Sequence, residues 1–175
     1  YASYIRVNLS SPNTPGLRNL QHGETFRLLL EALKNEQSKL KTKHGKSVPL
    51  MIKIAPDLDA EEVKSIANVL VEYQVEAVIA TNTTLSRDAV QGLEHADEAG
   101  GLSGAPLLKA STEVVRIIRS TVGDQLKIIG VGGIVDSEGA AEKRRAGADL
   151  LQIYSGFIYK GPKLIRDASE GFARG

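Results

Sequence analysis

Cysteine and tryptophan are absent from this chain of 175 residues, and methionine occurs once, at Met51. Without cysteine the chain forms neither disulfides nor thiolate nucleophiles, which is compatible with a reducing compartment. No apolar run approaches the ~20 residues that span a bilayer, and we find no pattern typical of a secretory signal. The sequence therefore excludes a disulfide scaffold and a membrane-spanning helix.

An excess of charge of either sign is also missing. Lysine and arginine total 22 against 21 aspartates and glutamates, and no basic block is interleaved with aromatic residues. A nucleic-acid partner is not expected from such a balance. The 42% hydrophobic and 25% charged residues are typical of a soluble globular protein.

Five short apolar stretches recur along the chain, and each ends in polar or glycine-rich residues. They predict buried parallel strands at Tyr4–Asn8, Leu50–Ala55, Ala77–Asn82, Lys127–Gly132 and Leu150–Ser155. The segments between them have helical periodicity, as in Val63, Ile66 and Leu70, which share one apolar face. Asp59 and Glu62 have the spacing of a capping box and predict a helix that starts beside them.

Strands that alternate with helices indicate an α/β fold with right-handed parallel connections. Polar residues follow every strand rather than one switch point, which favours a (β/α)8 TIM barrel over a doubly wound sheet. A whole barrel usually takes about 250 residues and eight strands. We therefore expect residues 1–175 to be the C-terminal part of a single barrel domain and to supply its last five units. The long connection Leu85–Lys109 is interpreted as an active-site loop.

The segment Asn8–Gly16 places two amides and several hydroxyl groups directly after the first predicted strand. Pro12 and Pro15 each fix φ and lack an N–H, so the loop is stiff. A stiff polar loop at a barrel strand end suits a site that holds reacting atoms in place. An ordinary turn has the same composition and stays an alternative.

Lys53 interrupts the apolar stretch Leu50–Ala55. Its charge must either face a polar site or be buried at a cost. Such a lysine can form a Schiff base or can donate a hydrogen bond to a cofactor ring. In the third interpretation, Lys53 lies at a strand edge and extends its charge to solvent.

Other strand ends carry uncharged polar groups or glycine. Thr81–Thr84 offers donors and acceptors suited to a flat polar ligand, although capping of a turn explains it equally well. Glycine-rich backbone at Gly100–Gly104, Gly130–Ile134 and Tyr154–Gly156 reaches the same rim and suits a phosphate. The position matches a flavin or another phosphorylated ligand, and the spacing G-x-G-x-x-G of dinucleotide sites is missing.

Metal chemistry is not expected. His22, His44 and His95 have no partner at metal-ligand spacing, so we assign them surface or structural roles. The acidic residues between 57 and 62 are better explained as a helix start than as an acid–base pair.

Six motifs, in one order along essentially the whole chain, resemble the dihydroorotate dehydrogenases, FMN enzymes of pyrimidine synthesis. Class 1 members have a cysteine base and class 2 members, which use quinones, have a serine; Ser11 stands at that position. The resemblance is therefore to the class 2, bacterial type. The motifs are NLSSPNTPGL at Asn8–Leu17, IKIAPD at Ile52–Asp57, IATNTTL at Ile79–Leu85, GGLSGAP at Gly100–Pro106, IGVGGI at Ile129–Ile134 and QIYSGFIYKGP at Gln152–Pro162.

The resemblance implies oxidation of (S)-dihydroorotate to orotate, with hydride transfer to FMN and reoxidation of the flavin by a quinone. Ser11 would be the general base, and because a serine hydroxyl is a poor base it needs a relay through hydrogen bonds. The substrate residues would be Asn8, Asn13, Asn82 and Thr83. The FMN residues would be Asn8, Lys53, Thr81, Gly104, Gly133, Tyr154 and Ser155.

The resemblance also implies parts of the enzyme that this sequence lacks, namely the first strands and N-terminal helices that dock on the membrane. The full-length enzyme would then be a monomer, bound peripherally to the cytoplasmic side of the bacterial inner membrane. We expect the 175-residue chain alone to have little or no activity. Two alternatives stay open: a Schiff-base lyase or aldolase that uses Lys53, and an inactive half-barrel that only self-associates or binds a partner.

Overall fold

The computed structural model describes residues 2–175 and contains one parallel sheet of five strands. The strands lie side by side in chain order, so each one pairs with the next. This arrangement confirms the predicted α/β fold and is that of part of a barrel. The strands are β1 (Ile5–Asn8), β2 (Leu50–Ile54), β3 (Ala77–Ala80), β4 (Lys127–Val131) and β5 (Leu150–Gln152).

The strands are shorter than the sequence predicted. The predicted strands ended at Ala55, Asn82, Gly132 and Ser155, but each of these residues lies beyond the last residue of its strand. After β3 and β4 the backbone leaves the sheet where Thr81 and Gly132 begin the loops. These residues therefore belong to the loops that form the rim of the sheet.

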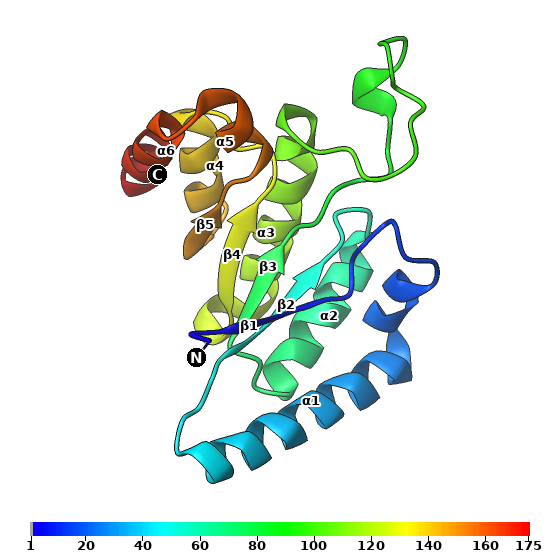
Figure 1. Cartoon of the computed structure of the whole chain (residues 1–175), viewed down its shortest axis with the longest axis vertical. Helices are drawn as coiled ribbons and strands as arrows, with labels where there is room; N and C mark the ends of the chain where they lie inside the picture. The colour runs from blue at the N-terminus through cyan, green and yellow to red at the C-terminus, as the bar shows by residue number, and fades with distance from the viewer. Residues whose placement is uncertain (1) are drawn as a thin grey trace.

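Helices connect the strands. The capping box predicted at Asp59 and Glu62 is present at the start of α2, where each side chain accepts a backbone N–H of the other residue. α4, α5 and α6 form a group at the β5 end of the sheet (Figure 1). The α-helices are α1 (Gly23–His44), α2 (Ala60–Glu72), α3 (Leu108–Val122), α4 (Ser137–Arg145), α5 (Ser155–Lys160) and α6 (Lys163–Arg174), and the 3-10 helices are η1 (Leu17–Gln21), η2 (Asp88–Val90), η3 (Ala105–Leu107) and η4 (Gly123–Gln125).

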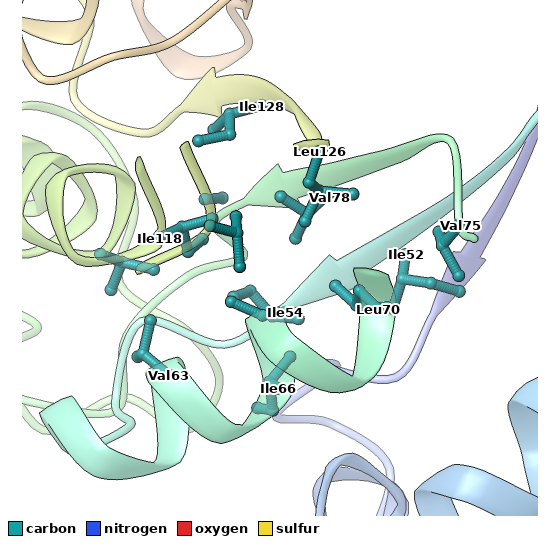
Figure 2. Close-up of a cluster of buried hydrophobic side chains, with 14 of the residues drawn as sticks. Ile52, Ile54, Val63, Ile66, Leu70, Val75, Val78, Ile118, Leu126 and Ile128 are labelled. Carbon is teal, nitrogen blue, oxygen red and sulfur yellow. The ribbon is translucent and has the colours of Figure 1, made fainter. Parts of the chain in front are cut away.

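Side chains alternate between the two faces of the sheet, as they must in extended strands. Ile52 and Ile54 of β2 lie between the sheet and α2, next to Ile66 and Leu70 (Figure 2). These side chains belong to the main core, which joins the sheet to α1, α2 and α3. The opposite face carries a smaller cluster that includes Ile79 and Ile129.

The connection between β3 and α3 departs from the compact pattern of the others. Residues 85–104, which we call the projecting loop, extend away from the sheet and contain η2 (Figure 1). An antiparallel bridge between Thr84 and Leu102 closes the base of this loop.

Within residues 2–175, no helix has the length and apolar character needed to cross a membrane.

Candidate active site

A hollow of about 270 Å³ lies at the carboxyl ends of the strands. Parallel strands bring their carboxyl ends to one edge of the sheet, so residues from all five units meet there. Asn8, Ser11 and Asn13 do not line the hollow. Eight of the residues predicted for substrate or flavin do: Lys53, Thr81, Asn82, Thr83, Gly104, Gly133, Tyr154 and Ser155.

The charged side chains that line the hollow are both basic. Lys53 extends from β2, and Arg6 extends from β1, two residues before Asn8 and on the same face of the strand. No carboxylate is among the lining residues. The hollow therefore favours an anionic or electron-rich ligand.

Lys53 is half-buried, and its ammonium group has no hydrogen-bond acceptor among residues 2–175. Burial lowers its pKa, and the nearby positive charge of Arg6 lowers the pKa further. A partly desolvated ammonium group without a partner gains most from a ligand that supplies an acceptor or a negative charge. This result agrees with the predicted role of Lys53 facing a polar site.

Asn8 and Asn82, both in the predicted substrate set, meet at the carboxyl ends of β1 and β3. The side-chain Nδ2 of Asn82 donates to Asn8 Oδ1 at 3.2 Å and to Ser10 Oγ at 3.1 Å. Ser10 Oγ donates to Asn8 Oδ1 at 2.9 Å and is fully buried. The three side chains form a preorganised polar network beside the hollow, in which each amide has a fixed orientation.

Ser11 and Asn13 lie on the loop that follows β1, next to this network. The backbone N–H of Asn13 donates to Ser11 Oγ at 3.3 Å. Within the described chain, no basic side chain accepts a hydrogen bond from the Ser11 hydroxyl. The loop thus presents a half-buried hydroxyl whose oxygen already receives one N–H.

The base of the projecting loop packs against the same residues. A Cβ atom added to Gly101 would lie 1.8 Å from Thr83 Oγ1 and 3.0 Å from Pro12 Cγ. Only glycine fits there, because any side chain would displace Thr83. Ser155 Oγ also donates a hydrogen bond of 2.8 Å to Ser103 Oγ. This bond and the close approach of Gly101 to Thr83 support the expectation that the connection Leu85–Lys109 takes part in the site.

Glycine backbone forms the opposite rim. Gly132 and Gly133 both have positive φ angles, 115° and 79°, directly after β4. A Cβ at Gly133 would lie 2.3 Å from the backbone of Leu108, so α3 approaches this loop closely. Backbone N–H groups in such a conformation suit the oxygens of a phosphate.

No group of three potential ligand side chains comes together within residues 2–175. His22 lies at the start of α1, His44 at its last residue and His95 in the projecting loop, all apart from the hollow.

Sequence reasoning missed Arg6, Ser10, Arg18 and Asp57. The spacing of Arg6 and Asn8 on one strand face was a usable indication for Arg6. Asp57 was interpreted as part of the start of α2, but the cap of that helix is Asp59. Asp57 instead pairs with Arg18 at 2.7 Å, a contact across 39 residues that no local pattern predicts.

Comparisons with known proteins agree with this geometry. A family profile described as Dihydroorotate dehydrogenase matches residues 1–174. A protein of Ectopseudomonas mendocina, named Dihydroorotate dehydrogenase (quinone), is 58% identical over 173 residues, which cover 99% of this chain and 51% of the relative. A protein of Aliivibrio salmonicida with the same name is 59% identical over 167 residues, which cover 95% of this chain and 50% of the relative.

A solved structure shows the same similarity. The crystal structure of DHODH from Eimeria tenella in complex with ferulenol superposes with a TM-score of 0.90 at 37% identity, covering 99% of this chain and 50% of that one. The chain spans about half the length of the curated relatives it matches.

Proposed function

Because the chain belongs to the dihydroorotate dehydrogenase family, we propose that it contributes to the oxidation of dihydroorotate to orotate in pyrimidine biosynthesis. Residues 1–175 then form the C-terminal part of one FMN-binding barrel domain. The observation that carries the proposal is the cluster of Asn8, Asn82 and Lys53 at the strand ends, within a chain matched by the family profile over residues 1–174.

FMN fits the chemistry of the hollow. The chemistry that FMN supplies when bound is the two-electron oxidation of the substrate. Lys53 offers an unpartnered ammonium group, and Gly132 with Gly133 offers backbone suited to a phosphate. We assign the cofactor to Asn8, Lys53, Thr81, Gly104, Gly133, Tyr154 and Ser155.

The substrate is assigned to the strand ends of β1 and β3 beside the hollow. Asn8, Asn13, Asn82 and Thr83 offer amide and hydroxyl groups that pair with a flat, amide-bearing ring such as dihydroorotate. The network of Asn8, Ser10 and Asn82 fixes the amides before the substrate arrives, which lowers the cost of ordering them.

We assign Ser11 as the base that removes the proton from C5 of dihydroorotate. The Asn13 N–H that donates to Ser11 Oγ stabilises negative charge on that oxygen as the proton leaves the hydroxyl. Ser11 must then pass its own proton onward, because a neutral hydroxyl binds a second proton only weakly.

A quinone is the proposed electron acceptor, since the curated relatives are named for it. We propose that the full-length protein is a monomer and associates peripherally with the cytoplasmic side of the bacterial inner membrane, where quinones reside. The Schiff-base alternative at Lys53 is not favoured by the family match. Borohydride trapping of substrate on Lys53 would reinstate it.

The test is anaerobic addition of dihydroorotate to the complete, flavin-loaded gene product. Flavin absorbance should bleach in the wild type. In Ser11→Ala we expect flavin binding and the spectral shift caused by orotate to persist, and the rate of bleaching to fall by about 10²–10⁴-fold, the usual contribution of a general base.

Ser120→Ala is the matched control, because Ser120 Oγ makes only a local contact on the exposed side of α3. It should bleach at the wild-type rate. Failure of the wild type to bleach would refute the proposed function, and unchanged bleaching of Ser11→Ala would refute the role of Ser11.

A further inference from the structure

One guanidinium group connects the loops that follow three neighbouring strands. Arg18 in η1 donates from Nε to the carbonyl of Ser10 at 3.2 Å, after β1. It donates from Nη1 to Asp57 Oδ2 at 2.7 Å, after β2, and from Nη2 to the carbonyl of Thr83 at 3.0 Å, after β3. Each branch of the side chain therefore contacts a different strand end.

Asp57 extends this connection. Its Oδ1 accepts a short hydrogen bond from Thr84 Oγ1, and its Oδ2 accepts the backbone N–H of Leu85 at 3.1 Å. Thr84 lies at the base of the projecting loop, and Leu85 is its first residue. The Arg18–Asp57 pair thus fixes both the loop that bears Ser11 and the segment that follows β3.

The pair is shielded from water more than the ion pair between α1 and α2, and to about the same degree as Arg119–Asp149. The exposed fractions of the side chains are 19% for Arg18 and 26% for Asp57, against 37% and 55% for Arg27 and Glu72 between α1 and α2. Shielding strengthens the attraction, and the planar guanidinium holds its acceptors in fixed directions. A lysine has one nitrogen and cannot reproduce the three-way contact.

The contacts end on neighbours of the candidate catalytic groups. Ser10, whose carbonyl binds Arg18, precedes Ser11 and also joins the Asn8–Asn82 network through its hydroxyl. Thr83, whose carbonyl binds Arg18, is in the proposed substrate set. Arg18 and Asp57 themselves do not line the hollow.

We propose that Arg18 and Asp57 are positioning residues that set the distance between the Ser11 loop and the Asn82–Thr83 segment, so that the base faces the substrate carbon. The proposal rests on the proposed function, since it concerns the geometry of that reaction. Proton transfer needs a well-defined separation, and a displacement of about 1 Å can cost about 100-fold in rate.

The first test measures the positioning itself. Amide hydrogen exchange of residues 9–17 and 81–85 should become at least several-fold faster in Arg18→Gln and in Asp57→Asn. The control is Arg27→Gln, which removes an ion pair of the same type on the outer helices. It should leave exchange in both segments unchanged.

The second test measures the reaction in the complete, flavin-loaded gene product. We expect the maximal rate of flavin reduction by dihydroorotate to fall by about 10- to 100-fold in Arg18→Gln. Flavin content should be retained, because Lys53 and the glycine rim lie outside these contacts. Arg18→Lys should recover part of the rate, and Arg18→Gln combined with Asp57→Asn should be no slower than the slower single variant.

The outcomes are distinguishable. A wild type that is not reduced refutes the proposed function and the positioning role with it. A reduced wild type with an unchanged rate in Arg18→Gln refutes the positioning role alone. Arg18→Gln could instead lose only thermal stability or flavin content, while the remaining flavoprotein is reduced at the normal rate. This result would assign Arg18 a merely structural role and would also overturn the proposal.

Discussion

Lys143 is a lysine buried in the core, and it lies outside the proposed mechanism. Its side chain on α4 is fully buried, and its Nζ donates to Ser111 Oγ of α3 at 2.5 Å. Ser111 Oγ in turn contacts the carbonyl of Gly132 at 3.1 Å, behind the glycine rim. Burial lowers the pKa of Lys143 from 10.5 to about 7.

We predict that Lys143→Met stabilises the protein at pH 6. Below pH 7 the folded chain holds a charged ammonium group in the core, and at about 1.4 kcal/mol per pKa unit this costs on the order of a few kcal/mol. Allowing for the lost hydrogen bond, the variant should gain about 1–3 kcal/mol of unfolding free energy. Urea unfolding measures it.

The pH dependence has a definite sign. Between pH 7 and 10.5 the unfolded chain binds the proton of Lys143 and the folded chain does not, so wild-type stability rises with pH in this window. The advantage of Lys143→Met should therefore shrink from pH 7 upward. Lys43→Met, at an exposed position of α1, should show no such trend. A less stable Lys143→Met at pH 6 would contradict the prediction.

Single residues differ in how far the sequence predicts them. Lys53 could be predicted because a charge inside an apolar strand is itself unusual. Asn8, Asn82 and Thr83 could be predicted because strand ends of barrels carry polar groups. Arg18 could not, because its partners lie 8, 39 and 65 residues away, and only the fold brings them together.

At the scale of elements, two carboxylates hold the amino ends of the strands in register. Glu76, before β3, accepts the N–H of Leu50 at 3.0 Å. Asp149, before β5, accepts the N–H of Ile128 at 2.8 Å and a hydrogen bond from Arg119 at 2.6 Å. Burial raises the pKa of each, but the hydrogen bonds and nearby cations outweigh it and leave each pKa below its ordinary value.

We predict that Asp149→Asn lowers the free energy of unfolding by about 2 kcal/mol at pH 7, the scale of hydrogen bonds to a charged group. Because the folded pKa is depressed, this contribution is present above the unfolded pKa of about 3.8 and is lost as pH falls through the folded value. The wild type and variant should converge in urea unfolding as the pH falls from about 3.8 through the folded pKa.

Asp124→Asn provides the control. Asp124 contacts the same arginine, Arg119, but its side chain is 94% exposed. It should change the unfolding free energy by less than about 0.5 kcal/mol. Equal effects of the two variants would contradict the role assigned to Asp149.

Elements themselves could largely be predicted. Apolar runs located all five strands, and the Asp59–Glu62 pair located the start of α2, because these patterns depend on neighbouring residues. The end of β1 was placed correctly, and the ends of β2 to β5 were placed one to three residues too late. Pairing in the sheet decides where a strand ends, and the sequence of one strand does not contain its partner.

The whole molecule has two open sheet edges among the residues that the structure describes. β1 pairs only with β2, and β5 pairs only with β4. Leu150 on the β5 edge is 59% exposed. Unpaired edges of this kind are unfavourable in water and favour association.

We predict that a polypeptide limited to these 175 residues has little or no dehydrogenase activity and binds flavin poorly. Purification should give a colourless protein, whereas the full-length gene product should be yellow. Visible absorption and dihydroorotate oxidation, measured on both, test this. Full turnover by the 175-residue polypeptide would refute it.

The order of the strands has a consequence for biosynthesis. Each of the strands β2 to β5 lies beside the one that precedes it in the chain, so each of these four strands has its partner in place when it leaves the ribosome. Domains fold from the amino terminus as they are synthesised. This half of the barrel therefore grows by adding one strand and its helix to an existing edge, and no strand after β1 waits for a later one before it can pair.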